Sequence, residues 1–116
     1  MKENKQLQSL IFELKRKSEQ EKVNIWKKVA SDLERPTRIR RIVNLSKINR
    51  YINDNEVALV PGKVLGGGDL EKKVTVAAYS FSKQAIDKIR QKNGKAVHIS
   101  ELMKSNPKGN KVRIIG

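Results

Sequence analysis

The chain contains no cysteine, which excludes disulfides, thiolate zinc sites and a cysteine nucleophile. Its one histidine, His98, excludes metal sites built from several histidines and leaves little basis for histidine-dependent catalysis. No stretch approaches about 18 consecutive apolar residues, so we expect no membrane span. The polar segment 1–6 leads into an amphipathic pattern, and we therefore expect no secretory peptide. Aromatic residues are also scarce, at 4% of the chain.

What the chain has in excess is positive charge. Its 116 residues include 26 Lys and Arg against 12 Asp and Glu, a formal net charge of +14. Such a charge opposes compaction and attracts polyanions. The length suits one domain, for which we expect four parts: a helical part (1–34), a basic connector (35–41), an α/β body (42–107) and a basic tail (108–116).

The first 34 residues carry helical periodicity. Leu7, Leu10, Ile11 and Leu14 form one apolar stripe, which predicts a helix over residues 5–18. A Ser18–Glu21 capping box predicts the start of a second helix, which Pro36 ends near residue 34. Because Trp26 lies on the stripe of this second helix, we expect it in the core.

The body alternates short strands and helices. We expect strands over 57–60, 63–65, 74–79 and 95–98, with a Pro61-Gly62 turn between the first two. Serines 46, 82 and 100 are candidate helix caps, and a weak repeat of strand, capped helix, turn and strand runs through the segment. On the first of these helices we place Ile48, Tyr51 and Ile52 on the apolar side. Gly94 should stop the helix that Ser82 begins. The expected class is α/β, with a helical N-terminal part followed by an irregular body of short strands and helices.

Catalytic and nucleotide motifs find little support. The run Gly66-Gly67-Gly68 matches neither a P-loop nor a dinucleotide loop. Two interpretations of it stay open: turn geometry, or close backbone approach to phosphates. The acid pairs Asp32/Glu34, Asp54/Glu56 and Asp69/Glu71 lie near turns and helix ends, which is typical of local charge balance, and His98 has no companion ligand, so we expect a structural role for it.

The strongest signal is an acid-free basic stretch. Residues 35–50 hold six basic side chains and no acid, so we expect these charges to lack ion-pair partners within the fold. Arginine forks onto phosphate oxygens, and phosphate neutralisation dominates duplex binding. No helix-turn-helix, zinc-finger or RNP pattern appears, which favours recognition of folded RNA by its shape and backbone. The stretch consists of Arg35, Arg38, Arg40, Arg41, Lys47 and Arg50.

Several motifs in fixed order also resemble a known family. The chain is similar to the archaeal and eukaryotic large-ribosomal-subunit proteins of the eighteen-e family, relatives of bacterial large-subunit protein fifteen, and its length is similar to that of the archaeal members. The matching motifs are Asn4-Lys-Gln-Leu7, Ile25-Trp-Lys-Lys-Val-Ala30, Leu33-Glu-Arg-Pro36, Val43-Asn-Leu-Ser-Lys-Ile-Asn49, Val60-Pro-Gly-Lys-Val-Leu-Gly66, Val74-Thr-Val-Ala-Ala78, Phe81-Ser82 and Asn106-Pro-Lys-Gly109.

This resemblance implies a non-enzymatic part of the large subunit of the cytoplasmic ribosome, with a fold of irregular ββα superhelical turns. The implied partners are large-subunit ribosomal RNA and neighbouring ribosomal proteins, with no cofactor, metal, membrane or small-molecule substrate. A free chromatin or RNA-chaperone protein is the alternative, and an enzyme acting on RNA is a third class. The implied RNA contacts are Arg35, Arg38, Arg40, Arg41, Lys47, Arg50, Lys63, Lys108, Lys111 and Arg113.

Overall fold

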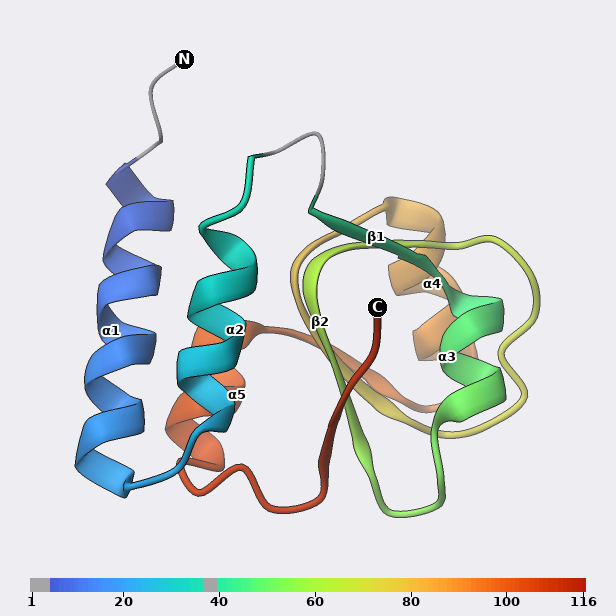
Figure 1. Cartoon of the computed structure of the whole chain (residues 1–116). Helices are drawn as coiled ribbons and strands as arrows, with labels where there is room; N and C mark the ends of the chain where they lie inside the picture. The colour runs from blue at the N-terminus through green and yellow to red at the C-terminus, as the bar shows by residue number, and fades with distance from the viewer. Residues whose placement is uncertain (1–4, 37–39) are drawn as a thin grey trace.

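The computed structural model describes residues 5–36 and 40–116. Two helices precede an alternation of short strands and helices, so the expected class is confirmed (Figure 1). In chain order the elements are α1 (Lys5–Glu21), α2 (Ile25–Leu33), β1 (Arg41–Asn44), α3 (Leu45–Tyr51), β2 (Val57–Leu65), β3 (Thr75–Phe81), α4 (Lys83–Gln91), β4 (Lys95–His98), α5 (Ile99–Ser105) and β5 (Val112–Ile114).

The strands form one parallel sheet in the order β1-β2-β3-β4, with β5 also paired to β2. Strand β5 pairs with residues 57–59 of β2 and β1 with residues 62–65, while β3 takes the other edge of β2. The units β1-α3-β2 and β3-α4-β4 have the strand, helix, strand order that the weak repeat predicted. Parallel strands need such crossovers, because a tight turn cannot join them.

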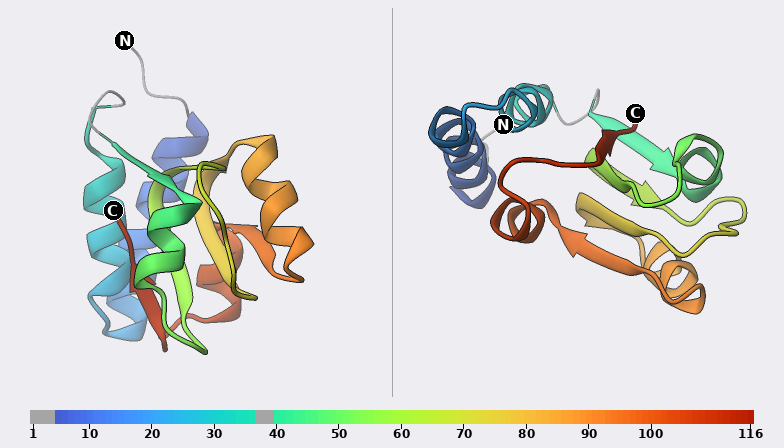
Figure 2. Two further views of the ribbon diagram at one scale, coloured as in Figure 1. Left: turned by 90° about the vertical axis from the view of Figure 1, so that its right-hand side faces the viewer. Right: turned by 90° about the horizontal axis from the view of Figure 1, so that it is seen from below.

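Helices cover both faces of the sheet, as the view from below shows (Figure 2, right). One core lies between the sheet and α3 and α4, and another between the sheet and α1, α2 and α5. In β2, Ala58 and Val60 enter the first core while Leu59 enters the second. Continuous apolar runs such as 57–60 are typical of strands buried on both faces.

Residues 61 and 62 lie inside β2, so the predicted Pro61-Gly62 turn is wrong. The physical reason is a local break in the ladders: β5 stops pairing at Leu59, β1 starts at Gly62, and the register with β3 shifts between Val60 and Lys63. A proline without an N–H fits such a break. Gly62 is needed for close approach, because a Cβ there would lie 2.0 Å from the carbonyl oxygen of Arg41.

Three of the four helix-start predictions in this chain are wrong. Ser18 lies inside α1, where it is buried and its hydroxyl donates to the carbonyl of Val23. The helix runs on to Glu21 and ends where Lys22 takes a left-handed conformation, with φ of 57°. Ser46 and Ser100 likewise lie within α3 and α5, behind the true cap residues Asn44 and His98.

The remaining start is confirmed, because the Ser82 hydroxyl accepts from the backbone N–H of Ala85 at 3.1 Å. His98 serves α5 in the same way, with Nδ1 accepting from the N–H of Ser100 at 3.2 Å, so its structural role is confirmed. Helix α4 ends at Gln91, and the N–H of Gly94 then bonds the carbonyl of Ile89 at 3.0 Å. The left-handed residue at this end is Asn93, with φ of 63°.

Candidate nucleic-acid interface

The basic stretch, residues 35–50, includes the edge strand β1 and the segments before and after it. It begins after α2, passes through β1 and ends on α3, along the upper and right-hand side of the view in Figure 1. Ile42 is paired in register with Lys63 of β2, and its side chain is 64% exposed. Because Val43 enters the core beside α3, Ile42 and Lys63 lie on the opposite face of the sheet. Basic side chains therefore occur on both sides of the edge strand.

Four of the candidate residues are exposed cations around this strand, and we name them the basic edge. None of them forms an ion pair with a residue that the structure describes. Two lie on α3, one directly after α2 and one in β2: Lys47, Arg50, Arg35 and Lys63. An exposed cation that is not held in an ion pair is available to an external anion. Arg35, Lys47 and Arg50 match the expectation that the acid-free stretch lacks ion-pair partners, whereas Lys63 lies outside that stretch.

Arg40 is half-buried and already bonded within the protein. Its Nε donates to the carbonyl oxygens of Leu33 at 3.1 Å and Arg35 at 3.0 Å. Those carbonyls belong to the end of α2 and the segment after it, where helix carbonyls lack intrahelical donors. Arg40 therefore helps to terminate α2. Arg38 lies outside the described residues.

Arg41 contradicts the expectation that the stretch has no ion-pair partners. Its Nη2 lies 3.1 Å from Oδ2 of Asp32 on α2, and the two side chains are only 25% and 15% exposed. The acidic partner comes from outside the stretch, nine positions earlier, because β1 begins near the end of α2 (Figure 1). Arg41 joins the helical part to the sheet.

We expect Arg41→Glu to lower the free energy of unfolding by about 2–4 kcal/mol, because it leaves two carboxylates facing each other in a half-buried site. Urea unfolding measures this effect. The matched control is Arg35→Glu, which changes an exposed cation and should stay within about 0.5 kcal/mol of wild type. Equal midpoints for both variants would show that the Asp32–Arg41 pair does not hold the two parts together.

The basic side chains of the tail lie toward the opposite end of β2, where β5 pairs with residues 57–59. Nζ of Lys108 lies 3.2 Å from Oε1 of Glu21, and Nε of Arg113 lies 3.0 Å from Oε1 of Glu56. Lys111 is exposed, and its carbonyl oxygen accepts from the N–H of Val57 at 2.8 Å. The tail therefore continues the fold as β5, with two of its three cations in ion pairs. The start of β5 pairs with Val57, and roughly 20 Å of extended strand separates Val57 from Lys63 of the basic edge.

The carboxyl of Glu56 accepts hydrogen bonds from the backbone of Asn53 and from the side chain of Arg113. The pKa of its carboxyl is lowered from the ordinary value, first by the hydrogen bond from the backbone N–H of Asn53 and then by Arg113. The charged form of Glu56 is therefore favoured in the folded state, and it links the turn before β2 to β5.

The glycine run closes the loop between β2 and β3. The N–H of Gly67 donates to Oδ1 of Asn44 at 3.0 Å, and its carbonyl oxygen accepts from the N–H of Ser46 at 3.1 Å. Nζ of Lys88 donates to the carbonyls of Gly66 and Gly68 at 2.7 and 2.9 Å. Gly68 has φ of 78°. These contacts support turn geometry, because the amide of Gly67 is used inside the protein.

Sequence reasoning missed Lys88 and Asn44 as organisers of this loop. Each lies 20 or more positions from its loop partner, and nothing in the local sequence connects them. It also misplaced Tyr51, which is 49% exposed and not on the apolar side of α3. The apolar side of α3 is formed by Leu45 and Ile48, together with Ile52 directly after the helix.

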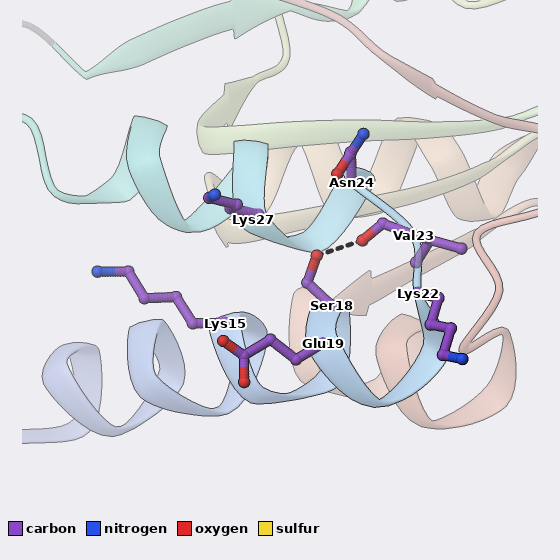
Figure 3. Close-up of a pocket in the computed structure, with 7 residues that line it drawn as sticks. All are labelled: Lys15, Ser18, Glu19, Lys22, Val23, Asn24 and Lys27. Atoms are coloured by element: carbon purple, nitrogen blue, oxygen red, sulfur yellow. Dashed lines mark hydrogen bonds between the residues drawn. The ribbon is translucent and has the colours of Figure 1, made fainter.

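A surface pocket of about 380 Å³ lies between α1 and α2, away from the basic edge (Figure 3). Although three lysines line it, Lys15 is paired with Glu34 at 2.9 Å and the Ser18 hydroxyl is bonded to Val23. Glu19 adds a negative charge to the lining. We therefore do not assign this pocket to the interface.

The described residues offer no group of three or more His, Cys, Asp or Glu side chains able to hold a metal ion. Within the same ranges, no helix combines the length and apolarity needed to cross a bilayer. What they do contain is a parallel α/β fold whose edge strand is surrounded by cations without acidic partners in the described ranges.

This fold and the basic edge define a basic α/β protein suited to a polyanionic partner. Comparison with known proteins identifies the family. A model of the family described as ribosomal proteins 50S-L15 and 50S-L18e, together with their counterpart in the 60S subunit, matches residues 4–97. The chain belongs to this ribosomal protein family, so it is a non-enzymatic protein of the cytoplasmic ribosome.

Relatives match over nearly the whole chain. The large ribosomal subunit protein eL18 of Methanothermobacter thermautotrophicus is 48% identical over 114 residues, covering 98% of this chain and 94% of the relative. The proteins of the same name from Methanoregula boonei and Archaeoglobus fulgidus are 47% and 46% identical, with 98% of this chain covered and 94% and 97% of the relatives. The expected resemblance is confirmed.

Proposed function

We propose that the protein is a structural constituent of the large ribosomal subunit that binds folded ribosomal RNA through the basic edge. The observation that carries the proposal is the set of four exposed cations around β1, none of which has an acidic partner among the described residues. Its large-subunit relatives support the assembly in which this binding would occur. Neighbouring ribosomal proteins are the further partners.

The contacts expected at this edge are with the sugar-phosphate backbone. Arg35 and Arg50 supply planar forks for phosphate oxygens, while Lys47 and Lys63 supply point charges. Because the cations lie on both sides of an edge strand, they fit a groove or a junction between RNA helices better than a flat surface. Backbone contacts position a protein without reading bases, and docking of this kind stabilises an RNA fold.

The alternative is a free nucleic-acid-binding protein, such as a chromatin or RNA-chaperone module. The basic edge alone serves both functions, since phosphates are common to every nucleic acid. Family membership favours the ribosomal function. A high-salt wash of isolated ribosomes separates the two, because a constituent stays with the large subunit while a free binder is released.

Titration of the full chain with a structured RNA at several salt concentrations tests the proposed contact. Four phosphates neutralised by the basic edge contribute a slope of about −3 to −4 to the plot of log affinity against log salt, using about 0.7–0.9 per phosphate. The tail and the connector can only steepen it. A slope near zero would contradict binding through phosphates.

A further inference from the structure

The end of α3 carries an exposed aromatic ring that the fold does not use. Tyr51 is 49% exposed and takes no part in the core to which Ile48 and Ile52 of the same helix belong. Of the five aromatic residues in the chain, Trp26 is fully buried and Tyr79 and Phe81 are half-buried. Only Tyr51 and Phe12 are exposed, and they differ in their surroundings.

The surroundings of Tyr51 are cationic. The guanidinium carbon of Arg50 lies over its ring, 5.9 Å from the centroid, and Lys47 lies one helical turn earlier. Neither cation is paired with an acid among the described residues. Asp54 follows in the next turn, where Lys72 and Lys73 also line the surface. By contrast, Phe12 lies on α1, which contributes no residue to the basic edge. Its neighbour in the sequence is Glu13, whose carboxylate is paired with Arg16 at 3.7 Å.

From this arrangement we propose that Tyr51 is a stacking platform for an unpaired nucleobase of the bound RNA, with Arg50 covering the ring on one side and contacting the adjacent phosphate. An aromatic ring beside a guanidinium is the arrangement that receives splayed-out bases in RNA recognition. A base stacks on it regardless of identity, because every base has a π face. The inference rests on the proposed function. It adds that the protein prefers an RNA site in which one nucleotide lies outside a base-paired helix.

This role makes Tyr51 different from the cations around it. Phosphate contacts respond to salt and are available on paired and unpaired RNA alike. Stacking on Tyr51 requires a base outside a helix and adds no ionic contact, so it changes affinity without changing the salt slope. The platform therefore predicts a preference for RNA with a bulge over a fully paired RNA of equal length.

Two RNA duplexes test the inference, one fully paired and one with a single bulged 2-aminopurine whose fluorescence falls when it stacks. We expect wild type to bind the bulged RNA about tenfold more tightly and to quench its fluorescence. Tyr51→Ala should lose both the preference and the quenching while keeping the salt slope. Tyr51→Phe should retain both, because the ring remains.

Two control variants distinguish stacking from charge. Phe12→Ala removes the other exposed ring and should behave as wild type. Arg50→Gln should weaken binding to both RNAs and make the salt slope shallower by about 0.7–0.9. If Tyr51→Ala keeps the wild-type preference and quenching, the stacking platform is wrong although the proposed function stands. If wild type binds neither RNA, the proposed function fails and the platform with it.

Discussion

Reversing the charge of the four side chains of the basic edge should lower RNA affinity about a thousandfold at 0.1 M salt. Each phosphate contact contributes roughly 0.7–0.9 of a decade there relative to 1 M salt, and four contacts are lost. The variant replaces all four exposed cations with Glu, at Arg35, Lys47, Arg50 and Lys63. Its melting temperature should stay close to wild type, because none of these side chains is buried or paired with an acid that the structure describes.

A matched variant separates location from total charge. Lys5, Lys22, Lys27 and Lys28 are exposed cations of α1, α2 and the link between them, and replacing them with Glu changes the formal net charge by the same amount, two units at each position, from +14 to +6. We expect this control to lose far less affinity than the variant of the basic edge. Equal losses would mean that RNA binding follows net charge and not the surface around β1.

Removing the indole of Trp26 should cost about 3–5 kcal/mol of folding stability, the range for truncating a fully buried Trp. The ring fills the core between α1, α2, α5 and the sheet, and its Nε1–H donates to the carbonyl oxygen of Pro107 at 2.7 Å. Trp26→Ala would therefore also leave that carbonyl without its donor. For a chain of this length the melting temperature should fall by roughly 10–20 °C.

Two substitutions serve as comparisons for Trp26→Ala. Trp26→Phe keeps most of the apolar volume but loses the hydrogen bond, and its melting temperature should lie between wild type and Trp26→Ala. Phe12→Ala removes a ring that is 62% exposed and should stay within about 0.5 kcal/mol of wild type. A Trp26→Ala protein that melts like wild type and fails only in RNA binding would reassign the indole to the RNA surface.

The apolar periodicity predicted the class of the fold because burial determines it. The stripe through Leu7, Leu10 and Leu14 is buried as expected, and the continuous run at 57–60 lies in the middle of the sheet. Trp26 is buried for the same reason, so its prediction as a core residue is confirmed. Patterns of this kind are local in sequence, and the covering of each face by helices follows from them.

The features that sequence reasoning missed depend on contacts between distant positions. Pro61 is tolerated inside β2 because two different strands meet there, which no local pattern reports. Serine is also ambiguous by itself: Ser82 caps a helix, whereas Ser18 bonds to the chain that follows its own helix. Whether a serine caps depends on where the helix actually starts.

The candidate interface was predictable in part. Exposure of Arg35, Lys47 and Arg50 follows from their polarity, and the absence of acids within residues 35–50 was visible in the sequence. The pairing of Arg41 with Asp32 was not, because it depends on the start of β1 lying near the end of α2. The same stretch of sequence therefore contains residues of two kinds, exposed cations outside any ion pair with a described residue and arginines bonded within the fold.

The most direct test of RNA docking through the basic edge is a density map of the assembled large subunit containing this protein. We expect RNA phosphates within about 4 Å of the charged atoms of Arg35, Lys47, Arg50 and Lys63, with RNA on both sides of β1. A map in which these four side chains face solvent, while the RNA contacts the protein elsewhere, would contradict it.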